Sequence, residues 1–182
     1  ISPYDDRTVD VYMRIEEGDR YYVRNITWVG NTIYPSSYLA AKLRMKKGDV
    51  YNQKLLGERT SSDEDAIGND YYNQGYVFYN LDPVEVNIVG DSIDLEMRIV
   101  EGPQATINKV RINGNDRLYE NVVRRELRTK PGDLFNKDAL ERSYREIAQM
   151  GHFNPENIQP DVQPDANNGT VDINWELESK AN

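Results

Sequence analysis

The sequence contains no cysteine and only one histidine, His152. The absence of thiols excludes a disulfide-stapled scaffold and a thiolate metal site, and one imidazole leaves little for zinc binding or acid–base catalysis. No apolar run approaches the roughly 18 residues that a membrane-spanning helix requires. The net charge of −9 disfavours binding to nucleic acid or to a bare anionic membrane, because both are negatively charged.

What the sequence does contain is an internal repeat. The stretch MRIEEGDRYYVRNITWVGN, which starts at Met13, returns as MRIVEGPQATINKVRINGN from Met97, 84 positions later. Gly48 and Gly132 keep the same spacing, within the matching runs GDVYN and GDLFN. A fixed period of this length is the signature of a tandem array of similar modules.

The second half of the repeat has a different spacing. Gly75 is followed by Tyr76, and Gly151 is followed by His152 and Phe153. These two glycines are only 76 positions apart. The first copy therefore carries eight extra residues, which amount to about two helical turns. We expect these residues to lengthen its second helix or the segment that leads into it.

One strand-like segment occurs three times, as VDVYMRIEEG from Val9, IDLEMRIVEG from Ile93 and VDINWELESK from Val171. Its alternation of apolar and polar residues is typical of a half-buried strand. Three such endings and only two beginnings predict that residues 1–18 are the C-terminal strand of a preceding module. Complete modules are then expected at residues 19–102 and 103–182.

Each copy is predicted to fold as strand, helix, helix, strand, strand. In the first copy these elements are expected at residues 23–29, 35–45, 53–73, 84–89 and 92–100. In the second, the first helix is expected within residues 117–130, the next between an Asn136 cap and Gly151, and the last strands at 157–163 and 170–177. This order predicts an α+β fold in which two helices cover one face of a three-stranded mixed sheet, giving a two-layer module. Six glycines are expected in its structural turns: Gly30, Gly48, Gly75, Gly114, Gly132 and Gly151.

Prolines place the second strand of each module at the edge of its sheet. Pro83 and Pro160 lie at the start of these strands or inside them, and proline lacks the N–H that an inner strand must donate. An edge strand can accept a strand from another chain. The first-copy strip comprises Val84, Glu85, Val86, Asn87 and Ile88, and its alternation predicts that the three apolar side chains point inward. An ordinary edge without a partner is the alternative.

Other residue groups give weaker indications. Arg124, Arg125 and Arg128 are expected on the polar side of a helix, either paired with neighbouring glutamates or in contact with a partner. The junction of Glu101, Gly102 and Pro103 is expected to restrict bending between the modules. The acidic run DED at residues 63–65 is interpreted as a solvated helix surface or as the entry to a helix, because consecutive helical residues point in different directions and do not converge on one site. No catalytic residue, metal site or cofactor is predicted.

The combined motifs resemble those of POTRA domains. These motifs are the Gly-Asn turn after the first strand, the Gly-Asp-x-aromatic-Asn link at Gly48 and Gly132, the Gly-aromatic element and the Glu-Gly junction. The runs VVRRELR and ERSYREIAQMGHF are similar to the last POTRA module of BamA-type outer-membrane protein assembly factors. The longer DEDAIGNDYYNQGY is similar to an earlier module.

This resemblance implies a non-catalytic scaffold in the Gram-negative periplasm. It implies binding of unfolded outer-membrane proteins, partly by β-augmentation at the edge strip, and docking of accessory lipoproteins. It also implies a C-terminal membrane β-barrel in the same chain after residue 182, which the three arginines could contact, and no nucleic-acid partner. The alternative is the POTRA region of a two-partner-secretion-type transporter that recognises a secreted substrate.

Overall fold

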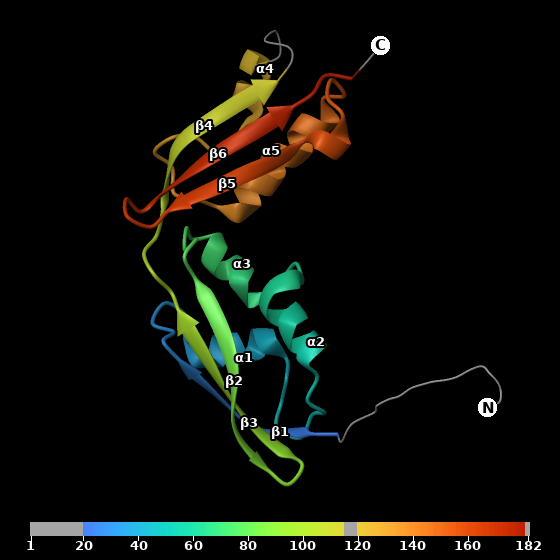
Figure 1. Ribbon diagram of the computed structural model, residues 1–182, viewed down its shortest axis with the longest axis vertical. Coiled ribbons are helices and arrows are strands. Elements are labelled where there is room, and N and C mark those ends of the chain that lie inside the picture. The colour runs from blue at the N-terminus through green and yellow to red at the C-terminus, as the bar shows by residue number, and fades with distance from the viewer. Residues whose placement is uncertain (1–19, 115–119, 181–182) are drawn as a thin grey trace, which may run out of the picture.

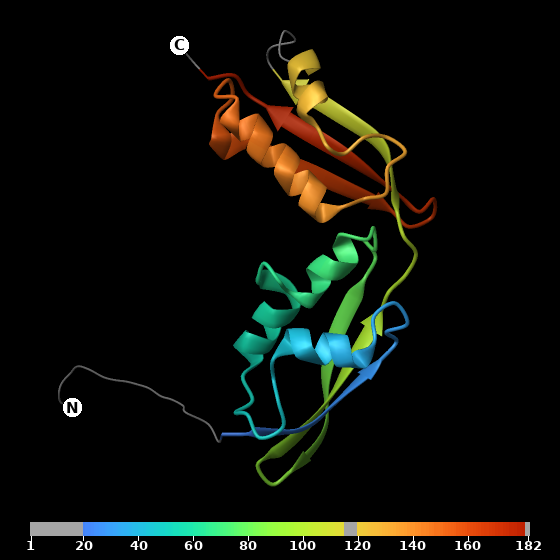
Figure 2. The same ribbon diagram turned by 180° about the vertical axis from the view of Figure 1, so that it is seen from behind.

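The computed structural model describes residues 20–114 and 120–180, which form two modules lying end to end (Figure 1). The predicted strand within residues 1–18 lies outside the described residues. In each module the helices pack against one face of a three-stranded sheet and leave the other face open (Figure 2). Within the described ranges, no helix is long and apolar enough to span a membrane.

Both modules contain the predicted order of elements, with additional short helical turns. The first module comprises β1 (Tyr22–Val29), α1 (Ser36–Leu43), α2 (Gln53–Gly57), the π-helical turn η3 (Glu58–Ser62), α3 (Ile67–Tyr72), β2 (Asn80–Val89) and β3 (Ser92–Val100). The second comprises β4 (Thr106–Gly114), α4 (Glu120–Glu126), α5 (Lys137–Gln149), the 3-10 turn η5 (Pro155–Asn157), β5 (Gln159–Asp165) and β6 (Thr170–Leu177).

The two sheets have the same topology. Their strand orders are β1-β3-β2 and β4-β6-β5. In each, the central strand is parallel to the first strand and antiparallel to the second. The predicted mixed sheet of an α+β module is thus confirmed. The central strands β3 and β6 span the residues predicted for them, because alternate side chains are buried along their whole length.

The second helix of the first module is broken, so the predicted continuous helix over residues 53–73 is wrong. Helix α2 ends at Gly57, the π-helical turn η3 follows, and α3 starts at Ile67. The Thr60 hydroxyl donates to the Leu56 carbonyl oxygen at 2.9 Å inside this turn. The second module has a single helix, α5, in the same place. The extra residues of the first copy therefore lie in the irregular segment that precedes α3.

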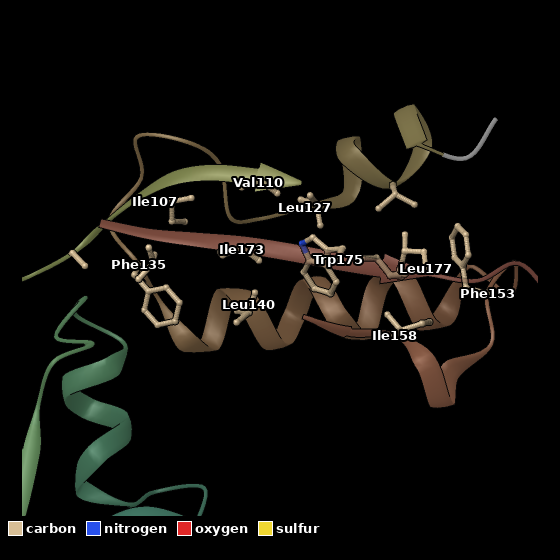
Figure 3. Close-up of a cluster of buried hydrophobic side chains, with 14 residues drawn as sticks. Ile107, Val110, Leu127, Phe135, Leu140, Phe153, Ile158, Ile173, Trp175 and Leu177 are labelled. Carbon is tan, nitrogen blue, oxygen red and sulfur yellow. The ribbon is translucent and has the colours of Figure 1, made fainter. Parts of the chain in front are cut away.

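Each module has its own hydrophobic core. In the second module, α5 and the sheet enclose Leu140, Ile173 and Trp175, among others (Figure 3). The first module packs Leu39, Ile67 and the buried residues of β3 into a separate cluster. Two cores of this kind are expected of modules that fold as separate units.

The predicted caps and most of the predicted turn glycines are present. The Asn136 side chain accepts a hydrogen bond from the Ala139 amide at 3.0 Å, which caps α5. Five of the six predicted glycines have a positive φ: Gly30, Gly48, Gly75, Gly132 and Gly151. Gly114 differs, because it is the last residue of β4. A Cβ atom there would lie 2.4 Å from the Leu177 carbonyl oxygen, so close strand packing explains the glycine.

Several element limits differ from the predictions, and three of these differences fall on residues discussed below. Strand β2 begins at Asn80, before the predicted residue 84. Strand β5 begins at Gln159, because η5 occupies the residues just before it. Helix α4 ends at Glu126, short of Arg128.

Candidate functional site

Strand β2 lies at the edge of its sheet, as its proline predicts. It pairs with β3 on one side, and no strand among the described residues pairs with its other side. Strand β5 occupies the equivalent edge of the second sheet. An edge strand of this kind exposes main-chain donors and acceptors to which an extended peptide can bind.

A β-bulge interrupts the middle of β2. Glu85 pairs with Leu95 and Asn87 pairs with Asp94, which leaves Val86 without a partner in the ladder. A bulge of this kind shifts the alternation of side chains by one position. The regular alternation that the sequence predicts for residues 84–88 is therefore broken at Val86.

The predicted inward orientation of the strip is wrong for Val84, which precedes the bulge, while the bulge returns Ile88 to the helix side. Val84 lies opposite Glu96, on the face of the sheet that carries no helices. Ile88 lies opposite the buried Ile93 on the helix side, yet 51% of its surface is exposed. Val86 is 47% exposed. The second half of β2 thus presents apolar side chains to solvent.

The strip also carries a carboxylate that is held by the helical layer. Glu85 accepts hydrogen bonds from the Tyr51 hydroxyl at 2.8 Å and from the side-chain amide of Gln53 at 3.2 Å. Partial burial, followed by this bond to Glu85, raises the pKa of Tyr51 to about 12. The phenol therefore remains a hydrogen-bond donor near neutral pH.

The tyrosines that precede β2 pack inside the core or against it. Tyr71 and Tyr79 are buried, and their rings stack with centroids 4.3 Å apart. Tyr72 and Tyr76 are half-buried and pack edge-on against this pair. The apolar surface of the strip therefore consists of aliphatic side chains.

Two of the three predicted arginines form intramolecular ion pairs. Arg124 pairs with Glu120 at 3.4 Å, and Arg128 pairs with Glu146 of α5 at 2.5 Å. The predicted pairing with Glu120 is thus present, whereas the carboxylate that holds Arg128 comes from another helix. The Arg125 Nε atom donates to the Asn121 carbonyl oxygen at 3.3 Å.

The predicted junction is fixed to the first module through Glu101. One carboxylate oxygen accepts from the Thr32 amide at 3.0 Å and from its hydroxyl at 2.6 Å. The other accepts from the Ile33 amide at 3.0 Å and from the Tyr71 hydroxyl at 2.7 Å. Partial burial alone would raise the pKa of Glu101, but these hydrogen bonds outweigh it and lower the pKa below its usual 4.5.

The residue after Glu101 continues this restriction. Gly102 has a φ of 68°, a conformation that is costly for other residues. A Cβ atom on it would lie 3.2 Å from Cβ of Phe78. Pro103 follows directly and has a fixed φ of its own. The connection between the modules is therefore short and conformationally restricted.

Beyond the connection, the two modules contact each other directly, and we call this contact the joint. It comprises residues 69–78 of the first module and residues 104–105 and 134–138 of the second. Its polar part joins α3 to the start of α5. Asn69 accepts a hydrogen bond from the Lys137 ammonium at 2.6 Å, and Asn73 accepts one from the Asp138 amide at 2.8 Å. The first module thus caps a helix of the second.

The apolar part of the joint is built around Gly75. A Cβ atom on this glycine would lie 2.7 Å from Cδ1 of Leu134, so the absence of a side chain makes room for the leucine. Val77 and Phe78 pack against the core of the second module. The Ala105 amide donates to the Gly75 carbonyl oxygen at 2.8 Å. The two modules are thus in contact through both apolar packing and hydrogen bonds.

Sequence reasoning did not identify Asn69, Asn73, Leu134 or Lys137 as joint residues. Three of them are polar and resemble any solvated side chain. Leu134 did carry a signal, because it is an apolar residue inside a polar link that the repeat preserves. That signal could have indicated a contact between modules.

The acidic run at residues 63–65 does not form a metal site. Asp63 pairs with Arg59 at 3.7 Å, and Asp65 pairs with Arg44. In the part of the chain that the structure describes, no three His, Asp or Glu side chains are grouped so that they could hold a metal ion.

Two copies of one β-α-α-β-β unit, joined in series and each with a sheet edge at which no described strand pairs, define a tandem-module protein. The sequence matches the POTRA family model, described as surface antigen variable number repeat, over residues 21–102 and 105–180. The chain belongs to the POTRA family, which confirms the resemblance noted from its motifs.

Curated relatives support the same assignment. The chain is 29% identical over 171 residues to a putative outer membrane protein assembly factor of Treponema pallidum, with 92% of this chain and 20% of the relative covered. It is 27% identical over 186 residues to outer membrane protein assembly factor BamA of Neisseria meningitidis, with 100% and 22% covered. The chain therefore spans about a fifth of the length of these relatives.

Solved structures show the same fold. The POTRA3-5 fragment of Haemophilus influenzae BamA superposes with a TM-score of 0.72 at 18% identity, with 87% of this chain and 61% of that chain covered. BamA from Haemophilus ducreyi lacking POTRA domains 1-3 gives a TM-score of 0.69 at 19% identity, with 88% and 30% covered.

Proposed function

We propose that this chain is part of a periplasmic scaffold of the outer-membrane β-barrel assembly machinery. Its modules, at residues 19–102 and 103–182, hold unfolded outer-membrane proteins and dock accessory lipoproteins near a membrane β-barrel of the same chain. Membership of the POTRA family and similarity to proteins named as assembly factors support this proposal. The function is binding without bond chemistry, so no catalytic residue is assigned.

The open edge of β2 is the observation that carries the proposal. The strand is ten residues long, pairs on one side only within the described residues, and exposes Val86, Ile88 and Val89 in its second half. An added strand would gain main-chain hydrogen bonds from the edge and apolar contacts from these side chains. Because the main chain provides most of the recognition, clients of many sequences can bind.

The equivalent edge of the second module is less suited to strand addition. Strand β5 has seven residues, and Pro160 and Pro164 are two of them. Each proline removes a donor that an added strand could use. We therefore assign client binding to Val84, Glu85, Val86, Asn87 and Ile88, and not to β5.

The arginine surface is proposed as the contact with a lipoprotein or with the barrel. Arg124 and Arg128 are already paired with glutamates, so Arg125 is the residue to test first. An attraction of about 1 kcal/mol for each basic residue would apply if the partner surface were anionic lipid. Replacement of Arg125 by glutamate should then weaken partner binding without unfolding α4.

The edge is tested by replacing Val86 with proline. Val86 has no partner in the ladder, so proline should leave the sheet pairing intact while making this part of the edge less able to accept a strand. A photo-reactive side chain at Val84 would report captured precursors in cells. Crosslinks to outer-membrane proteins should be lost in V86P and kept in the control V86T, which retains the N–H.

Two results would contradict the assignment to this edge. One is equal crosslinking in V86P and V86T, with unchanged thermal melting of both proteins. The other is stronger capture at Gln163 of β5 than at Val84, which would place client binding on the second module.

A further inference from the structure

The loop that follows the first helix has the same backbone structure in both modules. The period of 84 residues makes Lys46 equivalent to Lys130 and Asp49 equivalent to Asp133. The aspartate side chain accepts from the lysine main-chain amide in both copies, at 2.8 Å and 3.2 Å. The aspartate amide donates to the lysine carbonyl oxygen at 3.0 Å in both. The side chains around the two loops can therefore be compared position by position.

The side chains beneath the loop are smaller in the second module. In the first module, Met45 is 6% exposed and belongs to the core, and Ile26 packs against the same core. The equivalent residues of the second module are Thr129 and Val110, which lies beside Leu127 (Figure 3). A cavity of about 210 Å³ is present there, lined by Val110, Arg124, Leu127, Thr129, Lys130 and Pro131. The second module is thus hollow where the first packs a methionine.

The threonine brings a hydroxyl that the fold does not satisfy. Thr129 is 2% exposed, and its Oγ1 has no hydrogen-bond partner among the described residues. A buried hydroxyl without a partner destabilises a folded protein, and so does an unfilled cavity. A methionine at the same place, as in the first module, avoids both costs. The residue at position 129 is therefore poorly chosen for packing, which indicates a role in binding.

The rim of the cavity is cationic. Arg124 takes the place that Ala40 has in the first module, and its Nη1 donates to the Val110 carbonyl oxygen at 3.3 Å. Lys130 lines the same cavity and is exposed. The ion pair of Arg124 with Glu120 is exposed and 3.4 Å long, and such pairs contribute little stability. A carboxylate from another molecule can therefore replace Glu120.

We propose that this cavity is the docking pocket for a glutamate side chain of a partner protein. The proposal rests on the partner contact assigned above to the arginine surface, and it names the side chain which that contact receives. The methylene groups of the glutamate would pack against Leu127 and Pro131. Its carboxylate would accept hydrogen bonds from Arg124 and Lys130. Rotation of Thr129 about χ1 would let its hydroxyl donate to the same carboxylate.

The lining of the cavity favours glutamate over other occupants. An apolar side chain would fill the space but would leave the Thr129 hydroxyl without a partner. A phosphate group would bind the cations but would meet the apolar surfaces of Val110 and Leu127. Glutamate combines a short apolar stem with a charged acceptor, so it complements both parts of the lining.

A nuclear magnetic resonance titration of the whole chain tests the pocket. The probe is a pentapeptide with one glutamate between glycines, acetylated and amidated so that the side chain carries its only charge. A peptide with glutamine in place of glutamate, and inorganic phosphate, are titrated separately. We expect saturable shifts of the amide resonances of residues 127–130 with the glutamate peptide. The glutamine peptide should bind about tenfold more weakly, because it lacks the charge.

Variants of the second module test the lining. T129M introduces the residue of the first module, so it should fill the cavity, raise the melting temperature and abolish the saturable shifts. T129S keeps the hydroxyl and should retain binding. R124Q removes the charge at the rim and should weaken binding about tenfold.

The first module provides a gain-of-binding test. M45T alone should open an equivalent cavity without a cationic rim, and it should not bind the glutamate peptide. The double variant A40R/M45T should bind it, with new shifts at residues 43–46. Thermal melting of both variants checks that the module remains folded.

The pocket and the proposed function can fail separately. Client crosslinking at Val84 should be equal in the wild-type protein and T129M. If the glutamate peptide gave no saturable shifts while R125E still weakened partner binding, the pocket would be wrong and the arginine surface would stand. Equal binding of the glutamine peptide, tighter binding of phosphate, or unchanged binding in T129M would also overturn the proposal.

Discussion

The side-chain oxygen of Asn73 lies 2.8 Å from the amide nitrogen of Asp138, so a residue of one module caps a helix of the other. The first-turn amides of a helix have no partner within the helix and require one from outside. Here the neighbouring module provides one. A large change in the angle between the modules would break this hydrogen bond.

Replacement of Asn73 by alanine should loosen the joint. The loss of a helix cap costs about 0.5–2 kcal/mol, and this cap connects the modules. Spin labels on cysteines introduced at Glu64 and Glu141 would report the distance distribution, since the chain has no cysteine of its own. The distribution should broaden in N73A. The control is N52A, which removes a cap inside the first module and should lower its stability without broadening the distribution.

Replacement of Gly75 by alanine should disrupt the joint through both backbone strain and crowding. Its φ of 86° costs roughly 1–2 kcal/mol for a residue with a side chain. The new methyl group would also meet Leu134. Gly48 provides the matched control, because its φ is 94° and a Cβ atom on it would have no neighbouring atom within 4 Å.

Urea unfolding should therefore give a lower free energy of unfolding for both G75A and G48A. Only G75A should broaden the distance distribution between the spin labels. Addition of L134A to G75A should remove the crowding and leave the strain. If G48A broadened the distribution as much as G75A, the steric explanation would be wrong.

Acidification should release the junction from the first module. The pKa of Glu101 is lowered in the folded protein, so its ionised form stabilises the fold above about pH 4.5, and this stabilisation is lost as the pH falls through the lowered value. E101Q should cost about 1–2 kcal/mol at pH 7, because hydrogen bonds to a charged group are replaced by weaker ones.

The measurement is urea unfolding of the wild-type protein and E101Q between pH 7 and pH 3. The two stabilities should converge as the pH falls. The exposed Glu64 provides the control, since E64Q should change stability little at any pH. If the difference in unfolding free energy between the wild-type protein and E101Q stayed constant with pH, the charge of Glu101 would not be the cause of the stabilisation.

The two cores should respond separately to cavity-forming substitutions. Ile173→Ala removes a fully buried side chain from the second core, and Leu95→Ala does the same in the first. Each should cost about 2–5 kcal/mol. Hydrogen exchange should accelerate in β4–β6 for I173A and in β1–β3 for L95A. Equal acceleration in both sheets for either variant would indicate one cooperative core.

The central strands could be predicted to the residue, while the edge strand could not. Strand β3 has a neighbour on each side, so its alternation is continuous from Ser92 to Val100. Strand β2 contains a bulge at Val86, and no local pattern in the sequence marks it. The edge position itself was predictable, because Pro83 cannot donate to an inner ladder.

The junction was predictable and the joint was not. The Glu-Gly-Pro run signals a restricted connection by its residue types alone. Asn73 and Lys137 act through a partner that lies 60 or more residues away in sequence. Their role depends on how two folded modules meet, and a solvated asparagine or lysine gives no sign of it.

The break between α2 and α3 has a consequence for the geometry of the whole array. Insertions or deletions in this segment would move α3 without touching a strand, because the segment lies between α2 and β2. Asn69 of α3 and Asn73 directly after it contact the second module, so such changes would alter the direction of the next module. The curvature of a string of these modules can therefore evolve through one short helical segment, with no alteration to any strand.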